Sequence, residues 1–292
     1  MVDIKKIRKS ICQTAEYLIN KDLTDLSGGN ISVRDKNRIY INERLSGPNY
    51  QWKIEEDSII VTDICKIPVI GDDDLITREA STHYLIYQTF PEINAIIHCH
   101  PLFMMVFGAA HMDIPSVTEG SRVILGDQPI TNIEESIPSS QDQAEKVVDN
   151  FKRRRLKDPN AALICNIPFH GMFTAGQNLN DALVYADIAN NCAKLLIYRQ
   201  LMFGNDPSAD LSIRKHFTRE DFSTMDIFKE VCKPGYVYED TSGQRTIYSS
   251  PGLIEKSPNQ IKSQIPVNSI SINKDKIVSI VTEVLLKLLS SK

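Results

Sequence analysis

Apolar residues recur along this chain with two different periods, and together these periods predict a mixture of helices and strands. Within residues 2–20, apolar side chains follow one another at intervals of three and four, which predicts an amphipathic helix. The same helical spacing recurs over residues 82–90, 102–109, 141–151 and 180–202. Short apolar runs that favour strands lie at residues 31–33, 38–41, 58–61, 93–98 and 161–167.

Turn-forming residues separate these elements. The sequence Ser27-Gly28-Gly29-Asn30 predicts a turn before the first strand, and residues 35–37 predict the turn of a hairpin. Ser46-Gly47-Pro48 predicts a break in regular structure. The basic run at residues 152–155 follows a helical pattern, so we expect a solvated helix end where cations suit the helix dipole.

The composition of the chain changes near Ser249. Residues 250–273 are rich in Ser, Pro, Asn and Gln, which is typical of a linker. Residues 274–292 place their apolar side chains on one stripe, which predicts a short amphipathic helix. The sequence therefore predicts a globular domain over residues 1–249, a flexible linker over 250–273 and a terminal helix over 274–292.

Histidines stand where two apolar runs end. His98 and His100 flank Cys99, and residues two apart in a strand project to the same side, so their imidazoles form two legs of a candidate metal site. His170 ends another apolar run and is the best placed third ligand. Three histidines leave an open position on a catalytic Zn²⁺ ion. Cys99 points away from the side shared by His98 and His100, so we expect it to pack and not to be a ligand. The alternative for His98 and His100 is a pair of ordinary strand histidines that donate to nearby carbonyl oxygens.

The remaining histidines and one acidic residue fit other roles. We expect His83 in the packing layer of a helix, and His111 and His216 at the surface. Glu79 precedes a predicted helix, where an acid favours the helix dipole, but near a metal it would serve as a general acid/base.

A second group of residues has the chemistry of an anion cradle. In Ser27-Gly28-Gly29-Asn30, glycines allow backbone N–H groups to converge, and the Ser and Asn side chains add donors. Ser46, Gly47 and Thr77 supply further donors, and Arg78 adds positive charge. The alternative for the glycine pair is a plain turn before a strand.

Composition excludes several classes of protein. The 292 residues are 42% hydrophobic and 24% charged, as in ordinary globular proteins, and the net charge of -4 gives no basis for nucleic-acid binding. We expect no signal peptide and no membrane-spanning segment, since no apolar run is long enough. The six cysteines lack C-x-x-C spacing and are expected to be free thiols in a reducing compartment.

These motifs, in this order, resemble the class II aldolase/adducin family over roughly residues 7–204. The resemblance rests on residues 28–34, on Glu79 with His83 four residues later, on His98-Cys99-His100 and on Phe169-His170-Gly171. It implies an α/β fold of three layers, in which a central, mostly antiparallel sheet lies between helices. It also implies a homotetramer with sites at subunit interfaces.

The resemblance implies a role for each matching residue. His98, His100 and His170 would ligate Zn²⁺, although imidazole also suits other divalent metals. Glu79 would be the acid/base at the carbon where the bond forms or breaks. The phosphate group of the substrate would be held by Gly29, Asn30, Ser46, Gly47 and Thr77.

Two departures from the family pattern affect these roles. Thr77-Arg78 replaces a Ser-Ser pair before the catalytic acid, so a hydroxyl is lost and a guanidinium gained. Glu119 stands where the fuculose-phosphate aldolases have a catalytic tyrosine. Glu119 is therefore the candidate for protonating the aldehyde oxygen, and the alternative is a tyrosine from the group Tyr236, Tyr238 and Tyr248.

The implied activity is cleavage of a ketose 1-phosphate, of the L-fuculose or L-rhamnulose type, to dihydroxyacetone phosphate and lactaldehyde. Alternatives on the same scaffold are an L-ribulose-5-phosphate 4-epimerase, another metal-dependent lyase, and an adducin-like interaction module without a metal. The terminal segment 274–292 resembles an encapsulation peptide of bacterial microcompartments, which implies shell or cargo partners. The expected location is the cytoplasm or the microcompartment lumen. The alternative is a helix that packs on its own protein.

Overall fold

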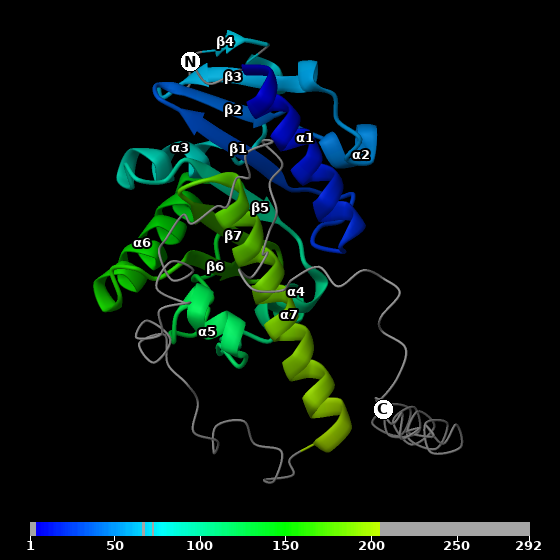
Figure 1. The fold of residues 1–292 in the computed structure, drawn as a ribbon, viewed down its shortest axis with the longest axis vertical. Helices are drawn as coiled ribbons and strands as arrows, with labels where there is room; N and C mark the ends of the chain where they lie inside the picture. Colours follow the sequence, from blue (N-terminus) through cyan, green and yellow to red (C-terminus); the bar gives the residue numbers. More distant parts are fainter. Residues whose placement is uncertain (1–3, 66–67, 72, 205–292) are drawn as a thin grey trace, which may run out of the picture. The chain divides into compact units, whose positions relative to one another are not determined.

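The computed structural model describes residues 4–65, 68–71 and 73–204 (Figure 1). Three predictions lie outside these residues: the linker over 250–273, the terminal helix over 274–292, and the surface position of His216. The tyrosines Tyr236, Tyr238 and Tyr248 also lie outside them. No helix among the described residues is both long enough and apolar enough to cross a membrane.

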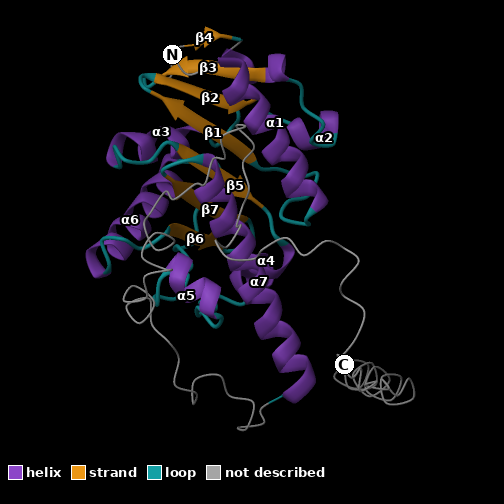
Figure 2. Cartoon of the chain, viewed as in Figure 1, coloured by secondary structure: helices purple, strands orange, loops and turns teal. Residues whose placement is uncertain are grey.

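The centre of the described part is one sheet of seven strands, in the order β4-β3-β2-β1-β5-β7-β6 (Figure 2). All neighbouring strands pair antiparallel. The strands are β1 (Asn30–Asp35), β2 (Arg38–Asn42), β3 (Ile59–Asp63), β4 (Pro68–Ile70), β5 (Ala95–Cys99), β6 (Leu163–Ile167) and β7 (Gly171–Gly176). β5 lies between β1 and β7 and contributes His98.

Helices cover both faces of the sheet. One face packs against α1 (Ile4–Asn20), α4 (Leu102–Ala109), α5 (Glu119–Leu125) and α7 (Leu179–Phe203), and the other packs against α3 (Ala80–Thr89) and α6 (Gln141–Lys157). The short helix α2 (Ser46–Tyr50) and the 3-10 turns η1 (Glu56–Ser58) and η2 (Asp73–Leu75) lie in connections. The chain therefore has the α/β fold of three layers, with an antiparallel sheet, that the resemblance implies.

Alternation along β5 decides which layer each side chain enters. Ala95, Ile97 and Cys99 are buried in the core beneath α1 and α7. Ile96 belongs to the core on the other face, beneath α3 and α6. His98 is in step with Ile96, so its imidazole lies on the α3 side of the sheet. Cys99 therefore packs away from His98, as predicted, and burial raises the pKa of its thiol far above its ordinary value.

Two local predictions differ from the structure, and some elements were not predicted. Ser46-Gly47-Pro48 begins the five-residue helix α2 instead of breaking regular structure, because Leu45 adopts a left-handed conformation (φ 61°) that turns the chain into the helix. β7 and α5 were not predicted, since the first has little apolar alternation and the second is very short.

The second prediction that differs concerns the basic run at the end of α6. The helix continues through it to Lys157, but Arg154 is only 3% exposed, and its guanidinium donates to the carbonyl oxygens of Leu125, Pro129 and Ala162. Arg154 is therefore not solvated: its buried hydrogen bonds link α6 to the segments that contain these three carbonyl groups. Burial lowers the pKa of the Arg154 guanidinium to about 10.

Candidate active site

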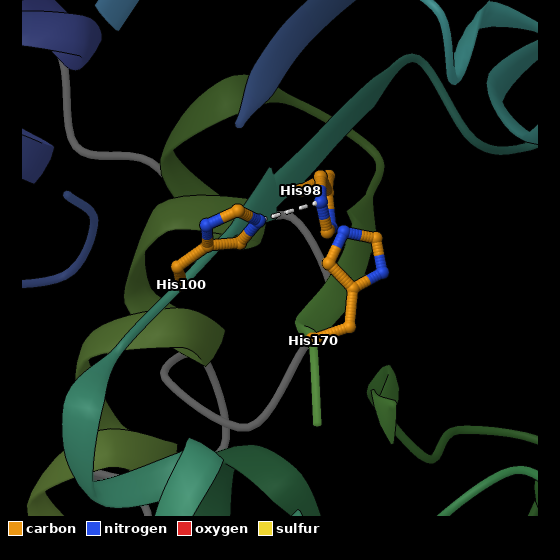
Figure 3. A group of neighbouring side chains, drawn as sticks. All are labelled: His98, His100 and His170. Atoms are coloured by element: carbon orange, nitrogen blue, oxygen red, sulfur yellow. Dashed lines mark hydrogen bonds between the residues drawn. The ribbon is translucent and has the colours of Figure 1, made fainter. Parts of the chain in front are cut away.

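Three histidine rings converge at the end of β5 (Figure 3). The nitrogens of His98, His100 and His170 that could serve as ligands all lie within 4.8 Å of one another. The ring centroids are 5.0 Å apart for His98 and His100, 4.8 Å for His98 and His170, and 5.1 Å for His100 and His170. Among the described residues, this is the group of His, Cys, Asp or Glu side chains that could hold a metal ion.

The antiparallel pairing of β5 and β7 explains why these rings meet. Cys99 pairs with Met172, so the turn that carries His170 lies beside His98 and His100. The approach depends on Gly171, because a Cβ atom there would lie 2.4 Å from the carbonyl oxygen of Cys99. Gly28 has a similar role, since its Cβ would lie 2.6 Å from Cε1 of His100.

Backbone and side-chain acceptors orient two of the rings. His98 Nδ1 lies 2.9 Å from the carbonyl oxygen of Met172, which only accepts, so Nδ1 carries a proton and Nε2 is the nitrogen that could bind a metal. His100 Nδ1 lies 3.3 Å from Oδ1 of Asp25 and 3.2 Å from Oγ of Ser27. Carbonyl and carboxylate partners of this kind fix metal-ligating histidines in proteins.

The two Nε2 atoms then face each other, only 3.2 Å apart. Two acceptor nitrogens at this separation repel unless a cation or a shared proton lies between them. His170 adds a buried Nδ1 that has no hydrogen-bond partner among the described residues. Burial lowers the pKa of His100 and of His170 to about 4, so both rings are neutral near pH 7, as metal ligation requires. The site therefore fits a divalent metal.

Glu79 completes the cluster from the start of α3. Its side chain is only 5% exposed, with Oε2 3.0 Å from Nε2 of His98 and Oε1 3.4 Å from Nε2 of His170. The amide of Gln143 in α6 donates to Oε1 at 3.3 Å. Burial raises the pKa of the Glu79 carboxyl, but the neighbouring imidazoles of His98 and His170 and the hydrogen bond from Gln143 outweigh it and hold the pKa below its ordinary value. The cluster thus contains an ionised, nearly buried carboxylate.

The candidate anion residues lie in two turns beside this cluster. Asn30 Nδ2 donates to Oγ1 of Thr77 at 3.2 Å, which joins β1 to the residues before α3. Ser27 contacts His100, and Ser46 is held by Asn42 Nδ2 at 3.0 Å. Cβ atoms on Gly29 and Gly47 would each approach the Trp52 ring within about 3.1 Å, so both turns pack on this one indole. Arg78 is exposed next to Thr77.

The family follows from comparison with known proteins. Residues 9–197 match the model of the class II aldolase and adducin N-terminal domain. The chain belongs to this family.

Relatives with different activities are similar to this member of the class II aldolase and adducin family. An L-fuculose phosphate aldolase of Methanococcus maripaludis is 26% identical over 169 residues, which are 58% of this chain and 84% of the relative. An L-ribulose-5-phosphate 4-epimerase UlaF of Salmonella typhi is 23% identical over 224 residues, which are 74% of this chain and 96% of the relative. A solved L-fuculose 1-phosphate aldolase superposes with a TM-score of 0.59 and 24% identity, covering 70% of this chain and 93% of that one.

Glu119 lies on a helix that carries none of the other candidate residues. It lies in the first turn of α5, after the N-cap Thr118, and its side chain is exposed. Within the described ranges, no hydrogen bond or ion pair joins it to the histidines or to Glu79. Its role in protonating an aldehyde stays a prediction.

Sequence reasoning missed two residues that contact the cluster. Asp25 lies 75 positions from His100, and Gln143 lies 64 positions from Glu79. Gln143 is held in place because its Oε1 accepts from the backbone N–H of Ser139, so its N–H faces Glu79. Neither residue belongs to a motif that its local sequence would reveal.

Asp25 yields a prediction about metal affinity. Because its carboxylate accepts the Nδ1 proton of His100, we expect Asp25→Asn to weaken metal binding by about 10- to 100-fold. The measurement is competition for the metal with a chelator of known affinity. The control is Asp22→Asn, an exposed acid at the end of α1. An unchanged metal affinity in Asp25→Asn would show that Ser27 alone orients the ring.

Proposed function

We propose that this protein is a zinc-dependent aldolase that cleaves a ketose 1-phosphate of the L-fuculose or L-rhamnulose type. The products would be dihydroxyacetone phosphate and lactaldehyde. The observation that carries the proposal is the convergence of His98, His100 and His170 on one point, with the carboxylate of Glu79 against two of their rings. The names of the aldolase relatives support this reaction class.

Each part of the site has a task in this reaction. His98, His100 and His170 would hold the ion, which when bound supplies Lewis-acid stabilisation of the negative charge that develops during cleavage. Glu79 moves the proton at the carbon where the bond breaks, because its carboxylate is the buried acid/base group of the cluster. Asn30 and Thr77, with Ser27, Gly29, Ser46 and Gly47, would hold the phosphate group, and Arg78 would add charge.

Metal removal tests the proposal. We expect dialysis against a chelator to abolish cleavage of L-fuculose 1-phosphate or L-rhamnulose 1-phosphate, and stoichiometric Zn²⁺ to restore it. The products are identified directly by mass spectrometry, and Mn²⁺ and Fe²⁺ are tested in parallel because imidazole suits them too. Full activity in protein shown to be free of metal would contradict the proposed mechanism.

A 4-epimerase is the second candidate, because the UlaF relatives match a larger share of this chain than the aldolase relatives do. The same assay distinguishes the two: L-ribulose 5-phosphate would be converted to an epimer with its carbon chain intact. An adducin-like interaction module has no need of a buried carboxylate among histidines, whose desolvation is costly. Assembly as a homotetramer remains part of the proposal.

A further inference from the structure

A continuous chain of buried polar groups lies behind the Asn30–Thr77 pair. The Tyr87 hydroxyl is 2.8 Å from Oγ of Ser32, which is 2.6 Å from Nδ1 of His83. Nε2 of His83 contacts Oδ1 of Asn30, and Nδ2 of Asn30 donates to Thr77. Ser32 and His83 are fully buried, and Tyr87, Asn30 and Thr77 are at most 7% exposed. Water therefore cannot substitute for any link.

The direction in which protons are donated along this series of hydrogen bonds is set by Tyr87, at one end of the series. Ser32 Oγ is the one hydrogen-bond partner of the Tyr87 hydroxyl in the described part of the chain. Burial raises the pKa of Tyr87 far above its ordinary value, so its O–H stays intact and donates to Ser32. Ser32 then donates to Nδ1 of His83, and a neutral His83 carries its proton on Nε2. The reverse direction would leave a buried phenolic O–H without an acceptor.

His83 is neutral because burial lowers its pKa to about 3. Its Nε2–H therefore donates to Oδ1 of Asn30, which fixes the orientation of that amide. The amide turns its NH₂ group toward Thr77, and Oγ1 of Thr77 accepts one N–H. The second N–H of Asn30 and the hydroxyl hydrogen of Thr77 are then both available to an anion. With the amide reversed, Thr77 would donate to Asn30 and offer no hydrogen.

We infer that His83 is a positioning residue that makes the Asn30–Thr77 pair a donor pair for the phosphate group of the substrate. This inference rests on the proposed function, which places the phosphate at that pair. His83 does not touch substrate or metal. It acts through Asn30, from the layer between the sheet and α3, where its ring packs edge-on against Phe173.

The test uses His83→Leu, which removes both ring nitrogens, and His83→Gln, whose amide offers an acceptor and a donor on one planar group. Inorganic phosphate is the probe, as a competitive inhibitor of ketose 1-phosphate cleavage. We expect His83→Leu to raise the inhibition constant and KM about tenfold, the effect of losing roughly one hydrogen bond, with kcat within about threefold. His83→Gln is expected to restore both constants to within about threefold of wild type. Metal content should not change in either variant.

Two further variants keep the test informative if His83→Leu does not fold. Ser32→Ala removes the hydroxyl that donates to Nδ1 of His83, so it should also raise the inhibition constant of inorganic phosphate. Tyr84→Phe is the matched control, because Tyr84 is another buried tyrosine of α3 whose hydroxyl contacts Thr62 outside this chain of groups. Tyr84→Phe should leave the inhibition constant of inorganic phosphate at its wild-type value.

The outcomes separate this inference from the proposed function. A wild-type enzyme that cleaves the sugar phosphate and is inhibited by phosphate, with unchanged constants in His83→Leu and Ser32→Ala, would overturn the role of His83 alone. Equal loss in His83→Leu and His83→Gln would also overturn it, since packing rather than donor direction would then be responsible. A wild-type protein that neither cleaves the substrate nor binds phosphate would overturn both.

Discussion

Glu79→Gln is expected to lower kcat by about two to four orders of magnitude, the usual contribution of a general acid/base, while the purified protein keeps its metal. Glutamine has nearly the same shape as glutamate and can still accept hydrogen bonds, but it cannot take up and return a proton. The carboxylate of Glu79 contacts Nε2 of both His98 and His170, so it lies beside the point where the rings converge.

The measurement combines steady-state turnover of the ketose 1-phosphate with elemental analysis of the same preparation. Glu134→Gln is the control, because Glu134 is an exposed carboxylate before α6. A Glu79→Gln enzyme with wild-type kcat would show that another group moves the proton. Loss of the metal together with activity would instead assign Glu79 to metal binding.

His100→Ala is expected to lose both the metal and detectable turnover. The substitution removes one of three candidate ligands, and it also removes the partner of Asp25 and Ser27. The two remaining rings would hold a divalent ion much less tightly, so dialysis should strip it. His111→Ala is the control, since the side chain of His111 is 51% exposed and pairs with Glu135 at the surface.

Metal content after dialysis, measured with turnover, decides this prediction. Stoichiometric metal in His100→Ala would refute the proposed ligand set. A folded protein without metal is the expected state, and its circular dichroism should resemble that of the wild type, because His100 follows β5 and belongs to neither apolar core.

Much of this arrangement could be predicted because strand geometry is local. The two-residue spacing of His98 and His100 places their rings together, and Cys99 faces the other core for the same reason. The end of a strand before a glycine also indicated His170. These predictions needed only the alternation of one strand and the turn after another.

The rest depends on contacts that the sequence does not encode locally. Gln143 reaches Glu79 from a different helix, and the carbonyl oxygen of Met172 orients His98 only because β5 and β7 pair in one register. Arg154 was predicted to be solvated because it stands in a basic run at a helix end, but three carbonyl oxygens accept hydrogen bonds from its guanidinium. His83 was expected to pack in the helix layer, and it does. Its buried hydrogen-bond partners also fix which ring nitrogen donates, and the spacing of residues in the sequence does not reveal this.

The close approach of β5 and β7 at Gly171 bears on how a metal ion would enter and leave the site. Because Gly171 lets β5 and β7 approach closely, His98 lies in the sheet and His100 and His170 lie next to strand ends, and the sheet is held by two apolar cores without help from an ion. Small zinc domains, by contrast, unfold when stripped. Here the metal-free and metal-bound forms should have the same backbone conformation. Different divalent ions would therefore compete for a preformed site without any refolding of the chain.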